Sequence, residues 1–237
     1  MPTELPTTFS LLLGTAGVLA TFHTLIGVDH SLPFIALGRA RGWNLRRTLV
    51  ITGACGFAHV ASSVLIGLVG VGLGVALDQL SWLESARGEV AASLMIGFGL
   101  AYAAWAVWRG MRGQRHTHVH AHPDGTVHIH HQRHGEHRHP HRIDAVTPWA
   151  LFLILAFGPC EALIPLMLVP ALDQSWWQLS AVIVVFGVFT VGTMLVTVTL
   201  GYLGLSQIRF AGIERRLDEL AGLTVAASGV AVLWFGL

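Results

Sequence analysis

Five ionisable side chains lie inside otherwise apolar stretches of the sequence: His23, Asp29, His30, His59 and Glu161. A charge at the centre of a bilayer costs about 2.5–3.5 kcal/mol or more, so such groups usually mark a binding site or an ion pathway. Imidazole, carboxylate and thiolate ligands together suit Ni, Co, Zn or Cu better than Mg or Ca. We therefore interpret these side chains as candidate metal ligands.

The spacing of the first three residues favours a shared site. His23 and His30 are seven residues apart, which is about two turns of a continuous helix and places both side chains on one face. Asp29 adjoins His30 and can orient its imidazole or bind a metal directly. The alternative is structural, in which these groups form hydrogen bonds between helices.

Two cysteines, Cys55 and Cys160, also lie in apolar sequence. His59 follows Cys55 by four residues, so the two side chains are predicted to point the same way from a helix. Both cysteines are candidate metal ligands. A small buried core residue is the alternative for Cys55, and a hydrogen bond to another helix is the alternative for His59.

Residues 116–141 hold 11 of the chain's 14 histidines. Histidines alternate with other residues on either side of a Pro-Asp-Gly turn signal, a pattern typical of a β-hairpin with imidazoles along one face. Short His-rich tracts are typical of metal binding; the alternative is a disordered linker. We expect the segment to capture metal or to regulate transport, with these candidate ligands: His116, His118, His120, His122, His128 and His130.

The composition indicates an integral membrane protein. Only 11% of the 237 residues are charged and 53% are hydrophobic, whereas soluble domains are about 25% charged. The chain has no Gly-x-x-x-x-Gly-Lys-Ser/Thr phosphate loop, so no ATP hydrolysis is expected. We expect no enzymatic activity and no nucleic-acid partner; the expected partners are the lipid bilayer and a divalent metal ion.

Six stretches are long and apolar enough for transmembrane helices. The predicted fold class is an all-α polytopic membrane protein, with two inverted three-helix halves (1–109 and 147–237) joined by the His-rich loop (110–146). Each half begins with a helix that carries a Gly, an acidic residue and a Pro, which predicts a broken helix. The expected spans are 9–37, 48–73, 90–108, 149–172, 180–203 and 220–235.

The arginines predict the orientation, because cytoplasmic loops are enriched in basic residues. In the six-helix arrangement 13 of the 14 arginines fall on one side. Only Arg87 falls on the other, together with Glu4, Asp78, Glu84, Glu89 and Asp173. The expected location is therefore the plasma (inner) membrane of a prokaryote, with both termini outside and the His-rich loop in the cytoplasm.

Three motifs resemble those of the nickel/cobalt transporter families, within the wider LysE-like superfamily. His23 followed by Asp29-His30 resembles their early-helix signature, residues 56–64 resemble the second motif, and residues 158–161 resemble a second-half motif at a helix break. The His-rich loop is similar to that of the efflux branch. The resemblance implies transport of Ni²⁺ or Co²⁺, with His23, Asp29, His30 and His59 as the conducting site.

Together, the residues and the resemblance predict a secondary transporter of a divalent transition-metal ion (Ni²⁺, Co²⁺ or Zn²⁺), and the resemblance favours efflux. Two alternatives remain open: a membrane thiol-disulfide carrier that uses Cys55 and Cys160, and a metal-sensing membrane protein without transport. Homo-oligomers and an intracellular metal donor or acceptor are further partners that this prediction admits.

Overall fold

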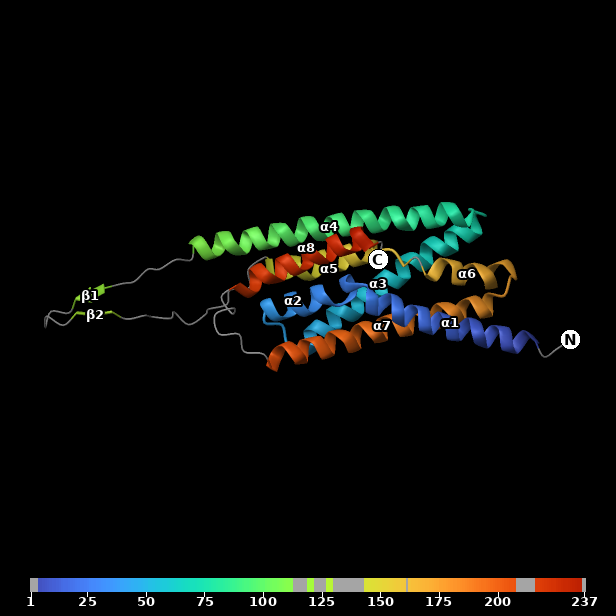
Figure 1. Ribbon diagram of the computed structural model, residues 1–237, viewed down its shortest axis with the longest axis horizontal. Helices are drawn as coiled ribbons and strands as arrows, with labels where there is room; N and C mark the ends of the chain where they lie inside the picture. Colours follow the sequence, from blue (N-terminus) through green and yellow to red (C-terminus); the bar gives the residue numbers. More distant parts are fainter. Residues whose placement is uncertain are drawn as a thin grey trace.

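The computed structural model describes residues 4–112, 119–121, 127–129, 143–160, 162–207 and 216–235. Figure 1 shows helices lying lengthwise beside one another in an elongated bundle, with the N-terminus at one end. The elements in chain order are α1 (Glu4–Ile26), η1 (Val28–His30), α2 (Leu32–Ala40), α3 (Leu45–Gly72), α4 (Leu77–Arg112), β1 (Val119–Ala121), β2 (Val127–Ile129), α5 (Ile143–Phe157), α6 (Leu163–Leu172), α7 (Trp176–Gln207) and α8 (Leu217–Phe235).

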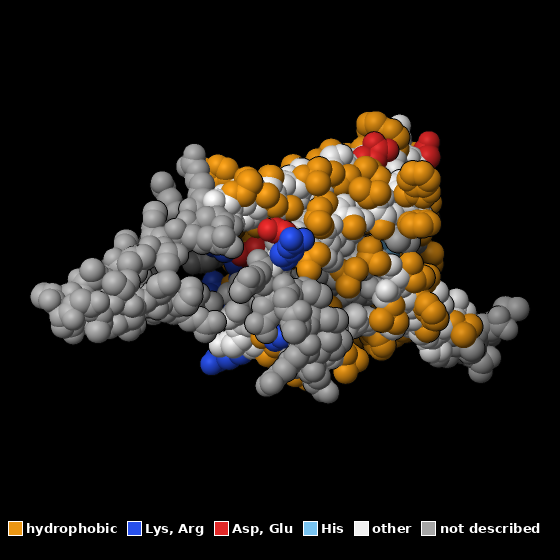
Figure 2. Space-filling view, turned by 60° about the vertical axis from the view of Figure 1, so that its left-hand side comes forward, with side chains coloured by type: hydrophobic (Ala, Val, Ile, Leu, Met, Phe, Trp, Pro, Cys, Tyr) orange, Lys and Arg blue, Asp and Glu red, His pale blue; other side chains and the backbone are white. Residues whose placement is uncertain are grey.

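Five of the described helices are long and apolar enough to cross a membrane: α1, α3, α4, α7 and α8. Their outward faces carry large hydrophobic side chains such as Phe57, Trp177 and Trp234, each more than 70% exposed. Figure 2 shows that hydrophobic side chains cover most of the described surface in that view. These features are those of a polytopic membrane protein, in which lipid covers the apolar exterior.

The chain breaks in the first predicted span, between α1 and α2. The backbone of Gly27 is extended, with φ −67° and ψ 95°, and the short 3₁₀ turn η1 follows it. Pro33 then lies in the first turn of α2, where its missing N–H leaves no helical bond unmade. The predicted break at 27–33 is therefore present, and it places Asp29 and His30 in non-α backbone.

A second break separates α5 from α6, with Gly158, Pro159 and Cys160 outside both helices. The 15 residues of α5 extend about 22 Å and the 10 residues of α6 about 15 Å. Neither helix alone matches a hydrocarbon core of about 30 Å. The break therefore lies within the apolar bundle.

The helix α4 begins at Leu77, so the predicted start of this span at Val90 was wrong. The sequence prediction had placed Glu84 and Arg87 beyond the membrane end of the helix. Both lie within α4 and are buried in the bundle: Glu84 is 0% exposed and the Arg87 side chain 12%. Their opposite charges compensate one another, so the polar stretch around them can continue as helix.

Helices of one half of the chain pack closely on helices of the other, since α4 lies against α8 and α1 against α7. The α4–α8 contact is made by glycines. A methyl group on Gly99 would lie 2.4 Å from the backbone N of Ala226, and one on Gly229 would lie 2.7 Å from the carbonyl O of Ala92. Only residues without a Cβ fit there.

The strands β1 and β2 pair antiparallel, with His120 opposite His128. This is the backbone pairing expected of a hairpin in the His-rich segment. The other candidate ligands of that segment lie outside the described residues: His116, His118, His122 and His130.

Candidate metal site at the two helix breaks

Three imidazoles from different elements meet beside the first break; those of His30 and His59 are buried and that of His23 is partly buried. His23 comes from the end of α1, His30 from η1 and His59 from the middle of α3. The ring centroids are 5.0 Å apart for His23 and His30, 4.9 Å for His30 and His59, and 6.3 Å for His23 and His59. Imidazoles this close together are candidate ligands of one metal ion.

His23 and His30 lie close together, as their spacing predicted, but for a different structural reason. On a continuous helix a seven-residue separation is about 10.5 Å along the axis, twice the observed 5.0 Å between rings. The helix instead ends at Ile26, and the turn at Gly27 brings His30 back toward His23. The break therefore creates the contact, and the shared helix face does not.

The carbonyl partners favour the tautomer in which Nδ1 of each ring carries the proton. His59 Nδ1 lies 3.1 Å from the carbonyl O of Leu155 in α5, and His30 Nδ1 lies 3.2 Å from the carbonyl O of Gly27. A carbonyl oxygen only accepts, so both Nδ1 atoms donate. In the neutral rings each Nε2 then carries a free lone pair.

The carboxylate of Asp29 strengthens this assignment for His30. Asp29 Oδ1 lies 3.0 Å from His30 Nδ1. The Nδ1–H bond is directed at Gly27, so the carboxylate contact is electrostatic and Asp29 Oδ1 has no aligned hydrogen bond among the described residues. A carboxylate or carbonyl behind Nδ1 is the usual support of a metal-binding histidine.

The two lone pairs face each other, because His30 Nε2 and His59 Nε2 are 3.3 Å apart. Two acceptors at this distance repel unless a cation lies between them. Nitrogen ligands at about 2.0–2.1 Å from a tetrahedral ion are about 3.3–3.4 Å apart. The two nitrogens therefore have the spacing of two ligands of one tetrahedral ion. Without a metal ion, a proton shared between them would remove the repulsion.

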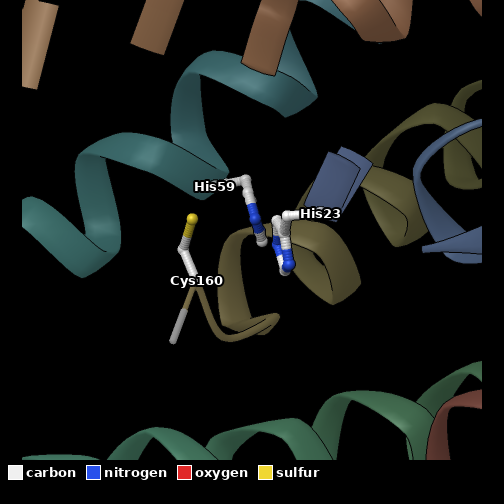
Figure 3. Close-up of side chains that lie close together, drawn as sticks. All are labelled: His23, His59 and Cys160. Carbon is white, nitrogen blue, oxygen red and sulfur yellow. The ribbon is translucent and has the colours of Figure 1, made fainter. Parts of the chain in front are cut away.

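Cys160, from the second break, lies close to two of these histidines. Ligand atoms of His23, His59 and Cys160 all lie within 4.8 Å of one another, and Figure 3 shows the three side chains converging from three segments. His23 Nε2 is buried without a hydrogen-bond partner in the described part of the chain. The site thus joins both helix breaks through α3.

Cys55 does not belong to this group. It packs with Phe34, Leu37 and Met194 in one apolar cluster, whereas Cys160 packs with Leu163 and Phe186 in another. Both thiols are free. The predicted i, i+4 relation of Cys55 to His59 therefore does not bring Cys55 to the candidate site.

A buried ion pair on α4 holds the second break in place. The Glu84 carboxylate pairs with Arg87 and accepts hydrogen bonds from Ser63 Oγ at 3.1 Å and from the backbone N of Cys160 at 3.0 Å. The hydrogen bond from Cys160 N to Glu84 holds the backbone of the residue that carries the candidate thiol ligand.

Arg87 satisfies the other end of the same break. Its Nη2 donates to the carbonyl oxygens of Ala156 at 3.1 Å and Gly158 at 3.4 Å. These carbonyls lie at and just beyond the end of α5, where the helix supplies no N–H partner. It also donates to Ser62 Oγ at 2.9 Å. Sequence reasoning missed this pair. The available signals were the i, i+3 spacing of Glu84 and Arg87 and the Ser62–Ser63 pair in an apolar helix.

Two glycines leave room for the imidazoles. A methyl group on Gly27 would lie 2.3 Å from His30 Nδ1, and one on Gly158 would lie 3.3 Å from His59 Nδ1. A Cβ at position 27 would therefore overlap the His30 ring, and one at position 158 would press on His59.

The remaining predicted intramembrane ligand, Glu161, lies outside the described residues. Comparison with known proteins adds no assignment: no family model, curated protein or solved structure matches the chain.

Proposed function

We propose that this protein is a secondary transporter of a divalent transition-metal ion, Ni²⁺ or Co²⁺ foremost and Zn²⁺ in addition. The observation that carries the proposal is the pair of facing Nε2 atoms of His30 and His59, buried among helices of membrane-spanning length. Sites at broken helices inside the bilayer are typical of secondary transporters. A fixed structural site would not need two breaks around it.

The proposed topology has six spans in two inverted halves. The first half is α1–η1–α2, α3 and α4, and the second is α5–α6, α7 and α8. What supports it is that the first span of each half is broken at a Gly and a nearby Pro. One donor group also joins His23, four residues before the first break, to Cys160 in the second break. This is the arrangement from which inverted-repeat transporters build a central site.

The proposed orientation rests on an arginine-rich end of the bundle. Arg41 and Arg109 lie over the Trp105 ring, Arg39 over Tyr202 and Arg47 over Trp43. In Figure 2 the arginine side chains gather at one end, and acidic side chains are present at the other. By the positive-inside rule the arginine end faces the cytoplasm, the side on which the His-rich segment begins.

The proposed direction is export, for which a driving force is needed. The membrane potential is worth about 2.3 kcal/mol per charge per 100 mV, so it opposes removal of a dication from the cell. Export therefore requires a coupled counter-ion, and protons moving inward are the simplest choice for a site made of imidazoles and a carboxylate.

The test is transport by the purified full chain in proteoliposomes. We expect flux of Ni²⁺, Co²⁺ or Zn²⁺ that responds to an imposed pH gradient, and no flux of Mg²⁺, because imidazole is a poor ligand for that hard ion. Empty liposomes measure the leak. The proposal is wrong if none of the transition-metal ions moves under any combination of pH gradient and membrane potential.

Deleting residues 116–141 is expected to raise the half-saturating metal concentration or weaken regulation while leaving measurable flux. The segment supplies imidazoles that concentrate metal next to the entrance and is not part of the buried site. A matched control keeps the segment's length and replaces its 11 histidines with asparagine. Loss of all flux in both variants would place the essential site in the loop instead.

A further inference from the structure

We infer that Cys160 is a ligand of the transported ion, in a second subsite that shares His59 with the His30 pair. This inference rests on the proposed function, and it refines the class of ion that the site takes. It follows from where the second helix break places the thiol relative to the three imidazoles.

His59 is the member common to two donor sets. Its Nε2 is 3.3 Å from His30 Nε2, and its ring also belongs with His23 and Cys160 to the group whose ligand atoms lie within 4.8 Å. His30 is not in that group, so its ligand atoms and those of His23 and Cys160 do not form one compact set. Two overlapping subsites result, one nitrogen-rich and one containing sulfur.

The sulfur-containing set needs only a small closure to bind an ion. Ligands of a tetrahedral ion with metal–sulfur and metal–nitrogen bonds of about 2.3 and 2.0–2.1 Å are about 3.3–3.6 Å apart. The present limit of 4.8 Å exceeds this by about 1.2–1.5 Å. Side-chain rotations of that size leave the backbone where the Glu84 hydrogen bond to Cys160 N holds it.

The chemical environment favours a ligand role over a packing role for these atoms. His23 Nε2 is buried with no hydrogen-bond partner within the described ranges, which costs free energy unless an ion occupies it for part of the cycle. Cys160 is 0% exposed and is the thiol nearest to that nitrogen. Binding of an ion as the thiolate complex releases the thiol proton to solvent.

The consequence concerns which ions the site selects. Thiolate and imidazole in a tetrahedral set favour Zn²⁺ and Co²⁺ over Mn²⁺ and Mg²⁺. An ion passing between the two subsites exchanges His30 for His23 and Cys160 while it keeps His59. At no point does it lose all of its protein ligands inside the apolar bundle.

Cobalt spectroscopy of the full chain in detergent tests the inference. A thiolate ligand gives Co²⁺ a sulfur-to-metal charge-transfer band in the near ultraviolet, whereas imidazoles do not. Because the chain has only two cysteines, the His-rich segment cannot produce this band. We expect the band in the wild-type protein and in Cys55→Ala, and its loss in Cys160→Ala.

If Cys160→Ala does not fold, the Cys55→Ala variant still decides the question. In Cys55→Ala the only thiol left is that of Cys160, so any thiolate band must come from it. A missing band in Cys55→Ala, with Co²⁺ flux intact, overturns the ligand assignment and leaves the proposed transport standing. A band without flux in proteoliposomes supports the assignment and overturns transport. The ratio of Zn²⁺ to Mn²⁺ flux should fall at least about tenfold in Cys160→Ala.

Discussion

His30→Ala is expected to reduce metal flux in proteoliposomes by at least about 100-fold, the upper range seen when even a supporting group of a metal site is removed. The change removes one of two facing Nε2 atoms and leaves the Asp29 carboxylate without the ring that it contacts at 3.0 Å. The ion would have no continuous set of ligands between the two breaks. Initial rates of Co²⁺ and Zn²⁺ uptake measure the effect.

The control for this loss is His120→Ala, a single imidazole removed from the His-rich segment, which should leave the rate within about twofold. His30→Gln separates binding from folding, since an amide can still donate to the Gly27 carbonyl but binds transition metals poorly. We expect His30→Gln to elute and unfold like the wild type while transporting no better than His30→Ala. Wild-type flux in either His30 variant would contradict the proposed site.

Arg87→Ala is expected to lower the free energy of unfolding by about 3–5 kcal/mol, the usual result of leaving one member of a buried ion pair behind. Glu84 would remain fully buried, and the carbonyl oxygens of Ala156 and Gly158 would lose their donor. For a chain of this size the change corresponds to a fall in Tm of roughly 10 °C. Thermal unfolding in detergent measures it.

The matched control lies on the same helix. Arg109 pairs with Asp218 at 2.7 Å, but its side chain is 55% exposed, so Arg109→Ala should cost below about 1 kcal/mol. Equal losses from the two substitutions would show that the Arg87 pair does not support the break. Arg87→Lys should recover only part of the stability, because a single ammonium cannot reach both carbonyls and Ser62 Oγ in the geometry of the guanidinium.

The sequence predicted the break in the first span because its signals are local. Gly27 leaves room for the His30 ring to fold back against it, and Pro33 removes a backbone donor; both effects act within a few residues. The ionisable residues were likewise recognisable, since a charge in an apolar stretch is costly whatever the tertiary structure. These two features gave the general position of the candidate site.

The assembly of the site was not predictable from the same signals. The approach of His30 to His59 depends on how η1 packs against α3, and the proton positions depend on the Leu155 carbonyl of α5, 96 residues away along the chain. Glu84 and Arg87 were misplaced for a related reason. The free-energy cost of burying the two charges is offset by hydrogen-bond partners in α3 and in the second break. These partners are distant in sequence, so no local pattern reveals them.

The glycine contact between α4 and α8 has a consequence for how the protein is made. α8 follows α4 in the chain with α5, α6 and α7 between them, so the surface around Gly99 has no α8 partner until those intervening segments have been synthesised. The Glu84–Arg87 pair likewise awaits Cys160, Ala156 and Gly158. α4 therefore acquires these contacts only after the segments that follow it, α5, α6 and α8, have been synthesised.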